Sequence, residues 1–384
     1  MGKKAQPEMP SFLSVAIVST QRDWHGGEEQ ARLLALGLRQ RGCRCTIFAR
    51  RGGAMAERLL SEGFPVISFA GSGRSPAAMW RIRQALRRLK PEILHYNDSH
   101  ALSCAGPAAM GLPVAGRVAA RRVDFPLRSP RIYHWFCDRL VCVSRAVAEV
   151  CRRGGLAEER LRVVYDGVDP TRVLSGNRRR GRLALQLAEE DTLLLTIAKL
   201  TDHKGHRFLL DAMPEVLQHW PRVLLALAGD GELRAELEQQ CARLGISSRV
   251  RFLSFRQDAP DLLHAADLFV LPSHLEGLCS TLIDAMLAER TIVATTAGGI
   301  PEVVGGAGPG GPEAVAWLVP PRDPQALAQG ILQALAAPEK CAAMRQAALR
   351  RAKKHFTAER MVEATLAVYE ELLLNNRRSR RTAD

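Results

Sequence analysis

The chain has 384 residues, with 54 Lys and Arg against 40 Asp and Glu and a formal net charge of +14 at pH 7. This length exceeds one compact core, so we expect two domains of roughly 150 to 200 residues each. Nine scattered cysteines without a C-x-x-C pair exclude a disulfide-stapled scaffold and are typical of a reduced, cytosolic protein. No stretch has the apolar length of a membrane span, so any membrane contact is expected to be peripheral. The basic balance favours anionic partners such as nucleotides, acidic lipids or nucleic acid.

Short apolar runs alternate with helical stretches through the first half of the chain. Residues 12–19 predict a strand, residues 28–42 an amphipathic helix and residues 45–50 a second strand. Further strands are predicted at 65–69, 92–96, 112–118, 139–144 and 161–165. This alternation predicts a parallel sheet covered by helices on both faces.

A polar, basic segment at 171–182 has the composition of a surface linker, and the alternation restarts after it. Strands are then predicted at 192–198, 222–228, 249–253, 268–272, 291–296 and 316–320. The pattern predicts an α/β protein of two Rossmann-like, doubly wound domains in series. The expected segments are an N-terminal domain (1–172), a linker (173–190), a second domain (191–356) and a C-terminal helix with a basic tail (357–384).

The stretch HLEGLCSTLIDAM, residues 274–286, sets Glu276 and Asp284 on either side of Gly277. A helix beginning at Gly277 would bring Asp284 round to nearly the same azimuth, with Glu276 just before the first turn. The free N–H groups and the dipole of that helix end attract phosphate. Two acids beside an anion site therefore indicate a ligand that carries both hydroxyls and phosphates.

Other strand ends carry weaker candidates. Gly26 and Gly27 precede the first long helix, where they would let the backbone approach a ligand, although such glycine pairs also occur for steric reasons alone. Lys199 and Lys204 follow the strand at 192–198, where they would clamp a diphosphate or simply be solvated.

Two polar groups of the first domain complete the candidates. Asp98 and His100 follow the strand at 92–96, where either would meet a hydroxyl in a cleft between the domains or serve a structural purpose. An arginine-rich run at 116–131 is interpreted as a loop facing an acceptor or an anionic membrane, and a solvated basic face explains it almost as well. Its candidate residues are Arg117, Arg121, Arg122 and Arg128.

Several motifs are missing from the sequence. It contains no D-x-D and no His, Asp or Glu cluster with metal spacing, so we expect no metal and no cofactor. It also lacks G-x-S-x-G, a Walker A loop and H-E-x-x-H, which argues against hydrolases and nucleoside triphosphatases.

Taken together, these segments resemble the retaining glycosyltransferases of family four, whose GT-B fold has two Rossmann-like domains facing a central cleft. Residues 26–50 resemble the family's opening G-G-x-E helix and second strand, and 163–169 its interdomain hinge. Residues 198–212 resemble its phosphate-clamping segment, and the blocks 225–255 and 264–304 follow the family almost element by element. This chain departs from the family in four places, with Asp166 for Asn, Lys199 for Arg, Asp284 for Glu, and Asn97 where some relatives carry His.

The resemblance implies a role for each part of the 274–286 stretch. Glu276 is expected to contact the sugar of a nucleotide-sugar donor and to be the main catalytic residue, with Asp98 and His100 as further catalytic candidates. Asp284 is expected to take the ribose hydroxyls, and the N–H groups of Gly277 and Leu278 to meet the diphosphate.

The same resemblance adds donor contacts from other loops. Lys199 and Lys204 would neutralise the phosphates, and the loop carrying Arg256 would frame the base. Gly26 and Gly27 would approach the donor from the first domain.

The implied activity is metal-independent transfer of a hexose, with retention of configuration, from a nucleotide-sugar donor to a glycan acceptor. A lipid-linked acceptor, such as a lipopolysaccharide precursor or another cell-envelope glycan, is expected, on a cytoplasmic protein with peripheral contact at the inner face of the membrane. The alternatives are another GT-B enzyme, such as a sugar-phosphate synthase or nucleotide-sugar epimerase, and a donor-binding but inactive partner subunit. Nucleic-acid binding is poorly supported, because only 5% of the residues are aromatic.

Overall fold

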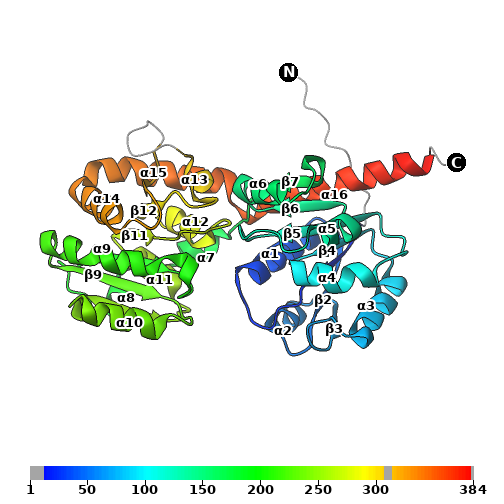
Figure 1. Ribbon diagram of the computed structural model, residues 1–384, viewed down its shortest axis with the longest axis horizontal. Coiled ribbons are helices and arrows are strands. Elements are labelled where there is room, and N and C mark those ends of the chain that lie inside the picture. Colours follow the sequence, from blue (N-terminus) through cyan, green and yellow to red (C-terminus); the bar gives the residue numbers. More distant parts are fainter. Residues whose placement is uncertain (1–12, 307–313, 382–384) are drawn as a thin grey trace, which may run out of the picture.

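The computed structural model describes residues 13–306 and 314–381, which form two parallel β-sheets with helices around each (Figure 1). The first sheet has seven strands in the order β3-β2-β1-β4-β5-β6-β7. Its strands are β1 (Ser14–Val18), β2 (Arg44–Arg50), β3 (Val66–Phe69), β4 (Ile93–Tyr96), β5 (Gly116–Arg121), β6 (Arg139–Cys142) and β7 (Leu161–Val163). Its helices are α1 (Gly26–Gln40), α2 (Ala54–Ser61), α3 (Pro76–Leu89), α4 (Ser99–Ala108), α5 (Pro130–Phe136) and α6 (Arg145–Arg153).

The second sheet has six strands in the order β10-β9-β8-β11-β12-β13. Its strands are β8 (Thr192–Ile197), β9 (Val223–Ala228), β10 (Val250–Ser254), β11 (Leu268–Leu271), β12 (Thr291–Thr295) and β13 (Trp317–Val319). The helices of this half are α7 (Pro170–Leu174), α8 (Arg178–Ala184), the 3-10 turn η2 (Asp202–Lys204), α9 (His206–His219), α10 (Arg234–Arg243), α11 (Ala259–Ala265), α12 (Ser280–Leu287), α13 (Ile300–Val304), α14 (Pro324–Ala336) and α15 (Pro338–His355). The two predicted Rossmann-like domains are therefore confirmed.

The strand order fixes where ligands can approach each sheet. In the first sheet β1 lies between β2 and β4, and in the second sheet β8 lies between β9 and β11. At such a switch point the connections leave toward opposite faces, which opens a crevice at the carboxyl ends of the strands. The crevices lie beside β1 and β4 in one domain and beside β8 and β11 in the other.

One predicted strand is displaced along the chain. The sequence predicted a strand at 112–118, whereas β5 spans Gly116–Arg121. Leu112 and Val114 are buried, but they lie in the turn that leads into the strand. Their apolar character reflects burial in the hydrophobic core and not strand pairing, and periodicity alone does not distinguish the two.

The structure differs from the predicted linker at residues 173–190. Helix α8 lies in this segment and packs against α11 of the second domain. A Cβ at Gly181 would collide with the carbonyl oxygen of Asp261, and Arg180 pairs with the same aspartate at 2.8 Å. The basic composition of this segment predicted a solvated linker. In the structure, Arg180 of this segment instead pairs with Asp261 where α8 packs against α11.

The final helix, α16 (Ala358–Arg381), returns to the first domain and packs against α1 and β5 (Figure 1). The Tyr369 hydroxyl lies 2.8 Å from Nδ1 of His95 in the interior, and Glu371 pairs with Arg139 and Arg162. The predicted C-terminal helix thus completes the first domain. The predicted basic tail is helical as far as Arg381, and residues 382–384 lie outside the described residues.

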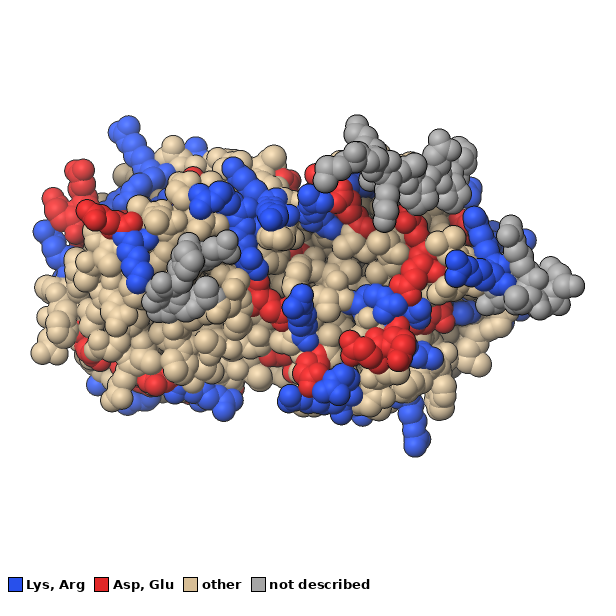
Figure 2. All heavy atoms as spheres, turned by 90° about the horizontal axis from the view of Figure 1, so that it is seen from above, with Lys and Arg blue, Asp and Glu red and all other residues tan. Residues whose placement is uncertain are grey.

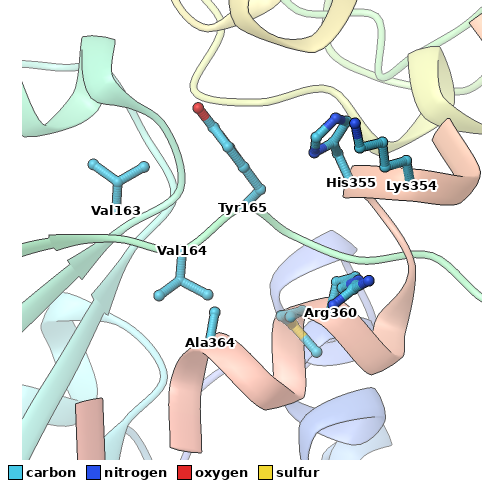
Figure 3. Close-up of a pocket in the computed structure, with 8 residues that line it drawn as sticks. Val163, Val164, Tyr165, Lys354, His355, Arg360 and Ala364 are labelled. Carbon is cyan, nitrogen blue, oxygen red and sulfur yellow. The ribbon is translucent and has the colours of Figure 1, made fainter. Parts of the chain in front are cut away.

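The two chain crossings between the domains are bonded to each other. Val168 N–H donates to the Phe356 carbonyl, and Ala358 N–H donates to the Val168 carbonyl, each at 2.9 Å. A Cβ at Gly167 would lie 2.6 Å from Cα of Ala358, so this approach requires a glycine. Beside the crossing, a cavity of about 330 Å³ lies between Tyr165 and the junction of α15 with α16 (Figure 3).

Candidate functional site

A buried ion pair marks the carboxyl ends of β8 and β11. Lys204 ends η2, after β8, and Glu276 lies in the turn after β11; Nζ of the lysine is 2.5 Å from Oε2 of the glutamate. The Ser273 hydroxyl donates to the same oxygen at 3.3 Å, and Glu276 is only 7% exposed. Burial opposes the charge on Lys204, but Glu276 and other neighbours raise its pKa overall. The structure therefore joins two of the predicted donor-binding residues and keeps the lysine charged.

The helix after Glu276 begins later than predicted. Helix α12 starts at Ser280, with Cys279 as its N-cap in extended backbone, so Gly277 and Leu278 belong to the preceding turn. Leu278 buries its side chain, whereas Gly277 lies against the first domain, where a Cβ would collide with the carbonyl oxygen of Arg122. The predicted helix start at Gly277 was wrong, because this approach by the other domain holds the glycine outside the helix.

Asp124, from the loop after β5, reaches this turn from the first domain. Its Oδ2 accepts the backbone N–H of Glu276 at 2.8 Å. On the other side the Glu276 carbonyl accepts the N–H of Gly299 at 2.9 Å. Gly298 has a φ of 49°, and a Cβ there would collide with the same carbonyl, so this position requires glycine. The backbone of Glu276 is thus fixed by both domains. Sequence reasoning missed Asp124, although its place just after a strand end was an available signal.

Asp284 lies one turn into α12 and is 5% exposed. Its Oδ2 accepts a hydrogen bond from Nη2 of Arg172, in α7, at 2.7 Å, while its Oδ1 is buried without a partner in the described part of the chain. Burial raises the pKa of Asp284 to about 6, and Arg172 limits that rise. The two acids of the predicted pair therefore have separate cationic partners, Lys204 at the end of η2 and Arg172 in α7.

The remaining predicted donor residues of the second domain lie on exposed loops. Lys199 follows β8 and has no ion-pair partner among residues 13–306 and 314–381. Arg256 pairs with Asp258 at 2.5 Å, beside the exposed ring of Phe255. Only Lys199 therefore offers an uncompensated charge.

At the first-domain crevice, α1 begins at Gly26, so the two glycines form its first turn and do not precede the helix as predicted. A Cβ at Gly26 would meet nothing within 4 Å, and one at Gly27 would come no nearer than 3.9 Å to Nδ2 of Asn97. A side chain at either position would therefore cause no clash within the chain. Close approach by a ligand remains as a reason for glycine at these positions.

Asp98 and His100, the predicted catalytic candidates of this domain, lie at the start of α4. Asp98 is the N-cap, with Oδ1 accepting the Ala101 N–H at 2.8 Å and the Thr20 hydroxyl at 3.3 Å, while Oδ2 is buried without a partner among the described residues. His100 is exposed and its Nδ1 lies 3.0 Å from Nη2 of Arg74. Neither contacts Glu276 within the residues that the structure describes, so a catalytic role stays a prediction.

Arg122 forms hydrogen bonds with Asp166 and Asn97, two residues that depart from the family pattern. Arg122 donates through Nε to Asp166 at 3.2 Å and through Nη1 to both the carbonyl and the side-chain oxygen of Asn97 at 2.8 Å. Burial raises the pKa of Asp166, and Arg122 opposes that rise. The charged residue in place of the hinge asparagine is therefore matched by the charge of Arg122.

The predicted membrane-facing arginines are mostly used inside the first domain. Besides Arg122, Arg121 is buried and donates to the Phe125 carbonyl, and Arg117 donates to the Leu112 carbonyl. Of the four, Arg128 is exposed, in the loop before α5. Figure 2 shows Lys and Arg interspersed with Asp and Glu over the face seen from above, so that face is not a single-sign patch. Three of the four arginines are thus engaged by partners within the first domain, and the role of this run toward an acceptor or a membrane stays a prediction.

Two other kinds of feature are absent from the described residues. Among residues 13–306 and 314–381, no three His, Cys, Asp or Glu side chains are grouped as metal ligands would be. Within the same residues, no helix combines the length and apolarity needed to span a bilayer.

Comparison with known proteins gives matches on both halves of the chain. The family model described as Glycosyltransferase Family 4 matches residues 24–172, and that described as Glycosyl transferases group 1 matches residues 177–351. The lipopolysaccharide core biosynthesis glycosyltransferase LpsE of Rhizobium meliloti is 27% identical over 57% of this chain and 60% of that protein. The D-inositol 3-phosphate glycosyltransferase of Geodermatophilus obscurus is 31% identical over 60% of this chain and 52% of that protein. This chain thus spans about half the length of such relatives.

Among solved structures, HepE of Anabaena in complex with UDP and glucose superposes with a TM-score of 0.80 at 22% identity, covering 93% of this chain and 99% of that chain. This likeness establishes the fold. Because the two family models together span most of the sequence on that fold, the chain belongs to the family 4, group 1 glycosyltransferases with the GT-B fold.

Proposed function

We propose that this protein transfers a hexose, with retention of configuration, from a nucleoside diphosphate sugar to a saccharide carried on a lipid. The observation that carries the proposal is the Lys204–Glu276 pair at the crevice of the second domain, at 2.5 Å. A cation of this kind can neutralise a diphosphate, and the acid beside it can accept a hydrogen bond from a sugar hydroxyl. HepE, solved with UDP and glucose, supports a donor of this class on the same fold.

The chemistry needs charge stabilisation more than it needs a protein nucleophile. As the sugar gains oxocarbenium character, negative charge grows on the departing diphosphate, and a preorganised cation stabilises that charge. Lys204 and the unpaired Lys199 can supply it without a metal. The leaving phosphate then takes the proton of the acceptor hydroxyl, on the same face from which the nucleotide departs.

Donor binding must also change the ion pair itself. In the free protein Glu276 neutralises Lys204, and a diphosphate that approaches Lys204 competes for that charge. The glutamate is then released to accept a hydrogen bond from the donor sugar, which couples phosphate binding to sugar recognition. Asp124 keeps the Glu276 backbone in place meanwhile, through the 2.8 Å bond to its N–H.

The acceptor class rests on different support. LpsE acts, by its name, in lipopolysaccharide core biosynthesis, and a net charge of +14 favours an anionic membrane as the place of the acceptor. A phosphorylated polyol is the second candidate, supported by the D-inositol 3-phosphate glycosyltransferase at 31% identity.

The test has two steps. Thermal stabilisation is first measured with UDP-, GDP-, ADP- and CDP-sugars, since a ligand that binds the folded state raises the melting temperature. The stabilising donor is then offered with lipid-linked saccharides or with sugar and polyol phosphates, and NMR reads the anomeric configuration of the product. Transfer to a lipid-linked saccharide with retention is expected. A product only with the soluble phosphates favours the second acceptor class, and a donor that is bound but never consumed indicates an inactive partner subunit.

A further inference from the structure

Helix α3 lies at the outer edge of the first domain, on the side away from the second domain (Figure 1). Its sequence, PAAMWRIRQALRRL, contains four arginines and no acid, and Lys90 follows it as the C-cap. This helix takes no part in the site described above.

The two faces of α3 differ in composition. Ala78, Ile82 and Leu86 are buried in the core of the first domain. Trp80, at i, shares the opposite face with positions i+4, i+7 and i+8, which are Gln84, Arg87 and Arg88. The apolar face of α3 is therefore already packed against the first domain. The face exposed to solvent carries Trp80 among arginine side chains.

The cations of this outer face are uncompensated. Arg81, Arg87, Arg88 and Lys90 are exposed, and none has a carboxylate partner within the residues that the structure describes. The fourth arginine of the helix, Arg83, donates to the carbonyl oxygens of Ala108 and Met110, at the C-terminal end of α4.

Helix α6 of the same domain shows the contrast. There Arg152 and Arg153 are also exposed, but both pair with Glu149 at 2.6 and 2.7 Å. A cluster of cations left without acids keeps a positive potential that attracts an anionic partner.

Exposed apolar groups accompany these charges. Trp80 is 63% exposed and Leu89 is 41% exposed. A groove of about 510 Å³ runs beside α3 and the edge strand β3, lined by Ile67, Trp80, Arg81, Gln84, Arg88 and Leu89. The groove brings apolar and cationic side chains to one opening.

We propose that this α3 surface, defined as Trp80, Arg81, Arg87, Arg88 and Leu89, docks the protein on an anionic lipid bilayer. The guanidinium groups pair with headgroup phosphates, and the indole and the leucine enter the interfacial layer, where amphipathic aromatic rings are favoured. A single-stranded nucleic acid fits less well, because it requires several aromatic platforms along a basic track and this surface has one. The proposal extends the proposed lipid-linked acceptor, since it holds the first domain at the membrane that carries it.

The test is co-sedimentation of the full chain with vesicles of phosphatidylcholine alone or mixed with phosphatidylglycerol. Binding to the mixed vesicles only, weakening as salt rises, is expected. The double variant Arg87→Glu/Arg88→Glu should lower the partition coefficient by at least about tenfold, since each lost cation weakens binding and each new acid is repelled. The matched control Arg152→Glu/Arg153→Glu makes the same change in net charge on α6 and should lower it much less.

A second pair of variants separates the apolar contribution. Trp80→Ala should weaken vesicle binding, whereas Trp135→Ala, which removes an exposed indole from α5, should not. Equal loss in both charge variants, equal binding to neutral and mixed vesicles, or binding to an oligonucleotide but to neither vesicle would overturn the proposal. Vesicle binding is read without any sugar transfer, so a protein that binds vesicles but transfers no sugar contradicts the proposed function alone.

Discussion

Arg172 reaches from α7 to Asp284 in α12, with its Nη2 2.7 Å from one carboxylate oxygen and the other oxygen buried without a partner among the described residues. Asp284 stands where the family resemblance expects a glutamate, so its side chain is one methylene shorter. A carboxylate that is 5% exposed needs a cation or hydrogen-bond donors to stay ionised, and Arg172, at the domain crossing, supplies one of them. We predict that the partnerless Oδ1 accepts a ribose hydroxyl of the donor.

This geometry predicts a pH dependence of donor use. Burial raises the pKa of Asp284 to about 6, with Glu29 raising it further and Arg172 lowering it. Ribose hydroxyls donate to the ionised form, so kcat/KM for the donor should be full above that pKa and fall as the pH drops through about 6. Asp284→Asn should flatten this limb and lower kcat/KM at pH 8 by roughly tenfold to 100-fold, through KM, as expected for the loss of a charged hydrogen bond.

Arg172→Gln provides the complementary measurement. Removal of the cation leaves burial unopposed, so the pKa of Asp284 should rise and the acidic limb of the profile should move to higher pH. A limb that stays in place in both variants would show that another group titrates there and that Asp284 does not bind the donor.

A second prediction concerns the close contact between the domains at Gly277. Gly277→Ala should push the Arg122 backbone away from the donor turn and lower kcat/KM on the order of 100-fold, as misplacement by about 1 Å can do. Because the contact lies between the domains and outside the hydrophobic core of either one, the melting temperature should change little.

The matched control is Gly37→Ala in α1. Its Cβ would lie 2.5 Å from a methyl of Val362, near the start of α16, so the variant should have a lower melting temperature and an unchanged kcat. If Gly277→Ala retained full activity, the contact between Gly277 and Arg122 would not belong to the catalytic geometry.

The sheets could be predicted from the sequence because their strands are nearly continuous apolar runs. The prediction at 222–228 differs by one residue from β9, all of whose side chains are buried. The roles of α8 and α16 could not be predicted, because basic or mixed helices do not reveal which distant element they pack against. Asp124 was missed for the same reason, since its partner is 152 positions away and its task is to accept a backbone N–H.

The start of α12 shows a further limit of pattern reading. Periodicity places Asp284 on a helix correctly, but it does not show that contact with another domain delays the first turn to Ser280. A site built from two domains is therefore predicted in its residue types and only partly in its geometry.

A third prediction concerns metal ions. We propose that Lys204 and Lys199 supply the positive charge for the diphosphate, so turnover should persist in excess EDTA at the rate measured with Mg²⁺. Loss of activity with the chelator and its return with Mg²⁺ or Mn²⁺ would show that a metal carries the leaving-group charge.

The last prediction separates the two tasks of the Lys204–Glu276 pair. Lys204→Ala leaves a buried carboxylate without its cation, which typically costs about 3–5 kcal/mol, so the melting temperature should fall. The same variant should lose the donor-induced rise in melting temperature, because the phosphate contact is gone. Glu276→Gln keeps the shape and frees the lysine, so donor affinity should be retained while kcat falls.

The double variant Lys204→Met/Glu276→Gln decides between stability and binding as the purpose of the pair. With neither charge left, the melting temperature should recover much of what Lys204→Ala loses, since a buried pair replaced by groups of similar volume is often close to neutral. Donor-induced stabilisation should not recover, because no cation remains at this position. If the double variant regained donor binding together with stability, Lys204 would be a structural partner of Glu276, and the phosphate contact would have to come from Lys199.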